Sequence, residues 1–202
     1  MTPTGKDNIQ NNVDRFDGKG PQNTIVDYSI QPGSGGWGIV FKWQSFVAVG
    51  KKSVLYFSGN YIATPQNTNR VLRTGANPTA LTAYNSISDQ YLLEAGIARP
   101  LKRVRGLSWS FGPRYEGVPA RDLIGDSLGF RRPGFALSLE PGLQYSRGKN
   151  MASISVGKAV FRARTRSVPD IRSGGHGDAA FADYVWLASY SFRFGKPRNV
   201  EQ

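Results

Sequence analysis

The sequence predicts an all-β fold of antiparallel strands, and three observations support this prediction. Seven segments after Gly36 alternate apolar and polar residues with a period of two, as strands with two different faces do. The chain contains 24 glycines and 12 prolines, which interrupt helices, and no segment keeps a helical period over ten residues. The connections between the seven segments are alternately short and long, as in a meander with its long loops at one end.

The chain divides into three parts. Residues 1–36 form a polar, turn-rich region in which a short strand is expected at 24–30. Residues 37–194 carry the alternating segments, and residues 195–202 form a polar tail. The expected strands, in order, are 37–49, 53–63, 88–98, 107–117, 135–146, 151–162 and 184–194.

The alternation assigns the two faces of these strands. Segment 107–117 is the clearest, because its apolar and polar residues separate completely by parity. The apolar face is expected to carry Trp109, Phe111, Leu137, Leu139, Tyr190 and Phe192, and the other face Ser110, Arg114, Glu116 and Glu140.

Alternation alone fits either a soluble sandwich, with the apolar face as its core, or a membrane barrel, with that face toward lipid. Three features favour the barrel. The strands are about 9–11 residues long, which is enough to cross a bilayer, aromatic residues lie at the strand ends, and short and long loops alternate. The prediction is an antiparallel meander transmembrane β-barrel with seven or eight strands present. Because single-chain bacterial barrels have even strand numbers, we expect this segment to be part of a larger barrel.

Polar residues on neighbouring strands are the candidates for a functional site. We expect Arg114 to pair with a flanking glutamate, because a lone charge in a narrow lumen is costly to desolvate. Such a constellation selects the permeating solute, whereas the simpler alternative is a solvated lining. The lumen-facing candidates are Gln90, Glu94, Arg114, Glu116, Glu140, Gln144 and Arg193.

Several chemistries are excluded or disfavoured by the residues present. The chain has no cysteine, which removes thiolate nucleophiles and thiolate metal sites, and its single histidine, His176, excludes any site that needs two imidazoles. The G-x-G-x-x-G pattern at 33–38 precedes a strand, so we interpret it as a turn. Paired glutamates also suit a glycosidase, but nothing in the sequence sets their separation. We therefore expect no enzymatic activity, no cofactor and no metal.

The charge of +12, from 26 basic and 14 acidic residues, raises a second hypothesis, a soluble basic β-protein that binds nucleic acid. Against it, the basic residues gather at both ends of the strands and no known RNA-binding motif occurs, so we expect no nucleic-acid partner. Basic residues at 51–52, 102–105 and 147–149 fall in the short turns. In the barrel these turns face the periplasm, and the arginines of the long loops face anionic lipopolysaccharide. The alternative is ordinary solvated charge.

The last segment, in which Tyr184, Trp186, Ala188, Tyr190, Phe192 and Phe194 alternate with other residues, is similar to the closing strand of Gram-negative outer-membrane barrels. In those proteins the barrel-insertion machinery reads this pattern, so the candidates for an insertion signal are Tyr190, Phe192 and Phe194. Two further stretches look like motifs of the outer-membrane transporters grouped as "MetA-pathway of phenol degradation". They are Pro3-Thr4-Gly5-Lys6-Asp7 and Gln31-Pro32-Gly33-Ser34-Gly35, and the second is preceded by Asp27 and Ser29.

This resemblance implies an outer-membrane channel or transporter for passive uptake or efflux of small, hydrophobic or aromatic solutes. It also implies outer-membrane lipid, lipopolysaccharide and the insertion machinery as partners. Two features depart from the pattern, since eight residues follow Phe194 and the signal peptide and early strands are absent. We interpret Met1 as an internal start in a truncated gene, and we expect the chain alone to form no functional pore.

Overall fold

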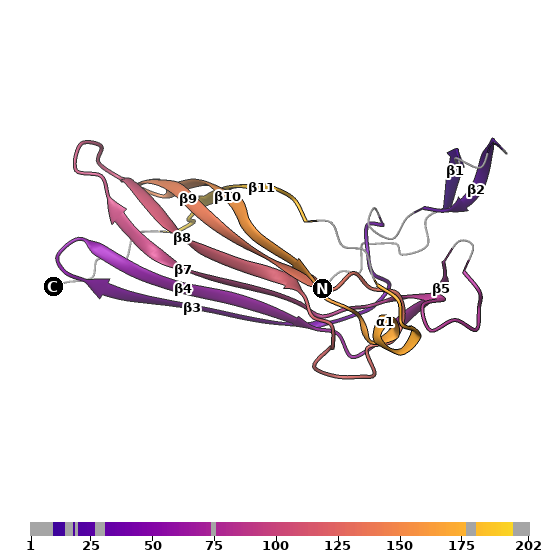
Figure 1. Cartoon of the computed structure of the whole chain (residues 1–202). Helices are drawn as coiled ribbons and strands as arrows, with labels where there is room; N and C mark the ends of the chain where they lie inside the picture. Colours follow the sequence, from indigo (N-terminus) through magenta and orange to yellow (C-terminus); the bar gives the residue numbers. More distant parts are fainter. Residues whose placement is uncertain are drawn as a thin grey trace.

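The computed structural model describes residues 10–14, 18, 20–26, 31–73, 76–176 and 181–195. Its main feature is a seven-stranded antiparallel sheet in the order β11-β10-β9-β8-β7-β4-β3 (Figure 1). The strands are β3 (Ile39–Val49), β4 (Ser53–Ala63), β7 (Gln90–Pro100), β8 (Leu107–Val118), β9 (Gly134–Arg147), β10 (Asn150–Arg164) and β11 (Tyr184–Phe192).

The predicted all-β meander is confirmed, and its strands differ from the expected ones mainly at their ends. β11 ends at Phe192, so Phe194 lies beyond the strand. The pairing of β9 with β10 contains a bulge between Ala159 and Phe161, which inserts an extra residue and locally increases the twist of the strand.

The polar region before the sheet contains a separate hairpin of β1 (Gln10–Asp14) and β2 (Pro21–Ile25). The strand expected at 24–30 is therefore placed at 21–25, because Ile25 already pairs with Gln10. Residues 27–30, the N-terminal motif at 3–7 and the tail from 196 onward lie outside the described residues.

The long connections contain short elements that the alternation does not predict. β5 (Thr68–Leu72) pairs with β6 (Tyr84–Ser86), and the helix α1 (Val168–Ser173) follows β10. α1 has one and a half turns and is specified by its ends, because Ser167 and Asp170 form a capping box and Gly174 ends the helix in a left-handed conformation.

The sheet is curled, so that one face is concave. Phe46 of β3 and Ser153 of β10 line the same cavity of about 380 Å³, although four strands lie between them. In a flat sheet their strands would lie about 24 Å apart, at about 4.8 Å per step. We call the concave side the inner face and the convex side the outer face.

The curled sheet does not close into a barrel within the described residues. Its edges are β3 and β11, which run in the same direction because six antiparallel pairings separate them. The two edges therefore cannot pair with each other in antiparallel fashion, and antiparallel closure needs an odd number of further strands.

The buried core lies at one end of the sheet, where the long connections pack together. We call this the loop end; Figure 1 shows α1 and β5 there, opposite the short turns of the turn end. The apolar side chains buried at the loop end are Ala63, Ala83, Ile87, Ala136 and Val168. Over the rest of the sheet the outer face is uncovered, and Phe111, Leu143 and Trp186 are 44%, 47% and 70% exposed.

β8 approaches β7 closely near the middle of the sheet. A Cβ at Gly112 would meet the Ala95 carbonyl oxygen and the Gly96 backbone, so this position requires glycine. Pro113 follows, and its missing N–H interrupts the ladder between the Glu94–Arg114 and Ile97–Phe111 pairs. Arg114 therefore emerges from an irregular point of the strand.

Candidate functional site

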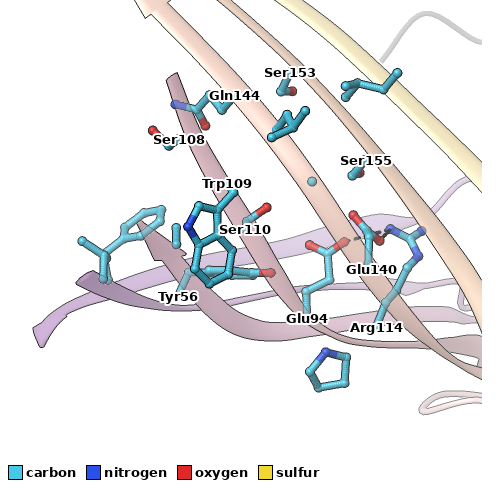
Figure 2. A pocket seen from close by; sticks show the side chains of 17 residues that line it. Tyr56, Glu94, Ser108, Trp109, Ser110, Arg114, Glu140, Gln144, Ser153 and Ser155 are labelled. Atoms are coloured by element: carbon cyan, nitrogen blue, oxygen red, sulfur yellow. Dashed lines mark hydrogen bonds and ion pairs between the residues drawn. The ribbon is translucent and has the colours of Figure 1, made fainter. Parts of the chain in front are cut away.

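Four charged side chains from three neighbouring strands meet on the inner face. Arg114 of β8 donates one hydrogen bond to Glu94 of β7 (2.8 Å), and its guanidinium lies 3.6 Å from Glu140 of β9 (Figure 2). It donates a second hydrogen bond to Glu116 of its own strand (2.7 Å). Ser58 of β4 donates a further hydrogen bond to Glu94 (2.8 Å). We call Arg114 and its three glutamates the inner-face cluster.

The inner-face cluster has more carboxylates than cations. One arginine faces three glutamates, which gives a formal charge of −2 when all are ionised. The Arg114 side chain is 9% exposed, so its charge is largely desolvated and its ion pairs are held in place by the sheet. Two buried atoms of the cluster, Arg114 Nε and Glu140 Oε2, make no hydrogen bond within the described structure. Both atoms are shielded from solvent, and Glu140 Oε2 is the oxygen that lies 3.6 Å from the guanidinium.

The cluster borders the cavity that spans the inner face (Figure 2). Toward the turn end, the polar side chains of this cavity are hydroxyls and amides, which interact with small solutes without a strong charge. They are Tyr56, Ser108, Ser110, Gln144, Ser153 and Ser155.

A second cavity of about 380 Å³ lies on the inner face at the loop end. The register places Glu116 beside Leu92 and Ala136, between Arg114 and the strand ends that border this second cavity. The inner-face cluster therefore lies between two hollows. The second cavity has an apolar side, formed by Trp37, Val40, Ile62 and Val118, and a polar side, formed by Thr64, Ser88, Gln90, Arg131 and Arg132.

The predicted site residues fall into three groups. Glu94, Arg114, Glu116 and Glu140 come together, while Gln144 lines the first cavity and Gln90 the second. Arg193 lies outside the cluster, exposed just after β11, where its backbone N–H donates to the Lys149 carbonyl. Of the insertion-signal candidates, Tyr190 and Phe192 belong to β11 and Phe194, beyond it, is 90% exposed.

A buried polar network at the loop end was not predicted from the sequence. Arg131 forms a double ion pair with Asp122, both side chains being at most 1% exposed, and donates to Ser86 (2.7 Å). No motif identifies these residues: Asp122 and Arg131 lie nine residues apart in the β8–β9 connection, Ser86 lies in the β4–β7 connection, and the three meet only through the fold. Asp89 belongs to the same network, since its backbone N–H donates to Asp122 (3.0 Å).

Asp89 is completely buried and is held by four hydrogen bonds. It accepts from Tyr61 OH (2.6 Å), the Thr64 N–H (2.7 Å) and hydroxyl (2.9 Å), and the Leu123 N–H (2.8 Å). Burial raises the pKa of a carboxyl group, but the hydrogen bonds outweigh this effect and hold the pKa of Asp89 below its usual value. Ionised Asp89 therefore anchors the end of β4 to two long connections.

The substitution Asp89→Asn is expected to destabilise the protein at pH 7 by about 1.5–3 kcal/mol, the range for hydrogen bonds to charged groups. Because the pKa of Asp89 is lower in the folded state, its contribution is complete above the ordinary carboxyl pKa of about 3.9 and is lost as pH falls through the folded value. Urea unfolding at pH 7 and below pH 4 should show the variant losing less stability in acid than the parent. Asp126→Asn, at an exposed carboxyl of the β8–β9 connection, is the control.

The outer face carries an aromatic row at its loop end. Rings on four adjacent strands follow one another with centroid distances of 5.3 Å (Tyr91–Tyr115), 5.1 Å (Tyr115–Phe135) and 5.8 Å (Phe135–Phe161). We call these four rings the loop-end row.

A second group of aromatic residues, the turn-end row, lies at the opposite end of the outer face and comprises Trp109, Tyr145, Tyr190 and Phe192. Trp109 also borders the inner cavity (Figure 2). Tyr145 is ten residues after Phe135 in β9, which corresponds to about 34 Å along the strand. If the strand is tilted by about 40° from the membrane normal, the distance between the two rows along that normal is about 26 Å. The exposed side chains between the two rows are mostly apolar and include Leu93, Phe111, Leu139, Leu143, Ile154 and Trp186. A charged exception is Lys158, which pairs with Leu139 across the sheet and places its Nζ 5.9 Å from the Tyr184 ring centroid.

No family model matches this chain, and no curated protein or solved structure is detectably similar to it. The fold and the site define it as an antiparallel β-protein with a curled sheet, a charged inner face and an apolar outer face. In the described residues, no group of three or more acidic or histidine side chains is arranged to hold a metal ion. The described part also contains no helix long and apolar enough to cross a membrane.

Proposed function

We propose that this chain forms part of an outer-membrane channel or transporter, in which the outer face contacts lipid and small solutes pass along the inner face. The observation that carries the proposal is the apolar outer band between two aromatic rows. Barrel proteins of the outer membrane have an outward apolar band about 25 Å tall with aromatic girdles at both interfaces. The distance of about 26 Å between the two rows of this chain, measured along the membrane normal for a strand tilted by about 40°, is close to that height.

The inner face supports a role in solute passage. Its two cavities, each of about 380 Å³, have a volume suited to small molecules. The inner-face cluster between them is a group of fixed charges on three neighbouring strands, at the point where a solute would have to move from one hollow to the other, comparable to the charged side chains at the constrictions of channels. The apolar side of the loop-end cavity suits hydrophobic or aromatic solutes, the class that the sequence resemblance implies.

Integration into a bilayer tests the proposal. The chain is diluted from urea into phosphatidylcholine vesicles, which are then floated on a density gradient and extracted with alkaline carbonate. We expect the chain to float with the vesicles and to resist extraction, because the exposed apolar band is stable only in lipid. A chain that stays in solution and binds single-stranded DNA with a steep salt dependence would contradict the proposal and support the nucleic-acid hypothesis.

Conductance of the purified chain in planar bilayers is expected to be absent or erratic. β3 and β11 present two open edges that cannot pair with each other in antiparallel fashion, and each unsatisfied backbone group in hydrocarbon costs several kcal/mol. The chain alone therefore has no closed ring to conduct through. Stable single-channel steps from the purified chain would show that it closes by itself.

A further inference from the structure

The turn end of the sheet carries a continuous rim of positive charge. The turns after β3, β7 and β9, and the segment after β11, all lie at this end, as the register of the strands requires. We call their basic residues the basic rim, which consists of Lys51, Lys52, Arg99, Lys102, Arg103, Arg105, Arg147, Lys149 and Arg193, all of them exposed.

Among the residues that the structure describes, no acidic side chain lies beside the basic rim. The described segments 46–56, 97–109, 143–153 and 189–194 contain neither aspartate nor glutamate. The nearest carboxylates along these strands, Glu94 and Glu140, already belong to the inner-face cluster. Nine like charges at one end of a small protein repel one another, so the rim is stabilised by an external anion.

The basic rim begins where the turn-end row of the outer face ends. Arg99 pairs across the sheet with Trp109, and Arg147 is two residues beyond Tyr145, so the charges begin where the turn-end row ends. In membrane proteins aromatic rings of this kind lie at the headgroup level, and lipid phosphates are found just outside them. Lys51, Lys52, Arg99 and Lys102 further surround a hollow of about 370 Å³ that joins the β3–β4 turn to the β7–β8 turn.

We propose that the basic rim binds the headgroups of anionic glycerophospholipids, with their phosphates against the hollow between the first two turns. This inference rests on the proposed function, because it takes the turn-end row as the boundary of the bilayer. Lysine and arginine form charge-assisted hydrogen bonds with phosphate oxygens, and each basic residue near an anionic membrane surface strengthens attachment about fivefold. The rim thereby fixes the turn end in the lipid leaflet that it faces.

Energy transfer from tryptophan to a pyrene-labelled lipid tests the inference. The full chain is placed in phosphatidylcholine vesicles that contain traces of pyrene-labelled phosphatidylglycerol, phosphatidylcholine or lipid A. The rim variant carries Lys51→Gln, Lys52→Gln, Lys102→Gln and Arg103→Gln. The charge-matched control carries Arg70→Gln, Arg121→Gln, Arg164→Gln and Arg172→Gln, four substitutions at the loop end.

We expect phosphatidylglycerol to be enriched beside the parent chain and the control, and this enrichment to fall at least about fivefold in the rim variant and in high salt. Lys51→Arg with Lys52→Arg should retain it. Equal transfer to phosphatidylglycerol and phosphatidylcholine, a preference for lipid A, or equal losses in the rim variant and the control would overturn the inference. Flotation with pure phosphatidylcholine vesicles is scored separately, since a chain that floats but shows no lipid preference refutes the basic-rim site alone.

Discussion

Replacing Arg114 by methionine is expected to lower the free energy of unfolding by about 3 kcal/mol. The substitution removes the cation that three carboxylates share and leaves Glu94, Glu116 and Glu140 to repel one another. Breaking a buried ion pair by removing one partner costs about 3–5 kcal/mol. The glutamates remain 15–29% exposed, which places the expected effect at the lower end of that range.

Urea unfolding of the chain in detergent micelles measures this effect. Gln144→Met, on the same cavity but outside the cluster, is the matched control and should change stability by less than about 0.5 kcal/mol. Combining Arg114→Met with Glu94→Gln and Glu116→Gln should recover part of the loss, because fewer uncompensated charges remain. An Arg114→Met variant as stable as the parent would mean that the inner-face cluster is solvated and does not stabilise the fold.

Replacing Asp122 by alanine is expected to have the largest effect on stability, a loss of about 3–5 kcal/mol. The Arg131 guanidinium is fully buried and would lose both of its bonds to this carboxylate, and the Asp89 N–H would lose its acceptor. The long connections that meet at the loop end should then become sensitive to protease, because this network joins them.

Limited proteolysis and urea unfolding together test this prediction, with Asp126→Ala as the control on the same connection. The double variant Asp122→Leu with Arg131→Met provides a further check, since replacing both members of a buried pair by apolar residues is often neutral. Cleavage of Asp122→Ala at the same rate as the parent would contradict the structural role given to the pair.

The strands of the sheet were predictable because their signal is local. A period of two in residues such as Leu107, Trp109 and Phe111 requires no knowledge of the partner strand. The same parity predicted that Arg114, Glu116 and Glu140 would share a face, since residues of one parity in paired strands point to one side. The cluster at the middle of the inner face follows from these two facts and the meander order.

Other parts of the fold were beyond local reasoning. The pairing of Asp122 with Arg131 spans nine residues of the β8–β9 connection, the attachment of Asp89 to Thr64 spans 25 residues of the β4–β7 connection, and no periodicity relates these residues. Helix α1 is too short to show a period and is specified by Ser167 and Asp170 at its start. The odd strand count predicted that these seven strands do not close by themselves, and within the described residues β3 and β11 are indeed open edges, which run in the same direction and so cannot pair in antiparallel fashion.

The most direct test of the account concerns two adjacent residues, Ser110 on the inner face and Phe111 on the outer face. The chain has no cysteine, so Ser110→Cys and Phe111→Cys can each carry a single polarity-sensitive fluorophore. In phosphatidylcholine vesicles, the label at 111 should be quenched by a quencher attached to lipid chains, and the label at 110 by aqueous iodide. Quenching of both labels by iodide to the same extent, or of neither by the lipid-borne quencher, would contradict the proposal that the outer face contacts lipid while the inner face is open to water.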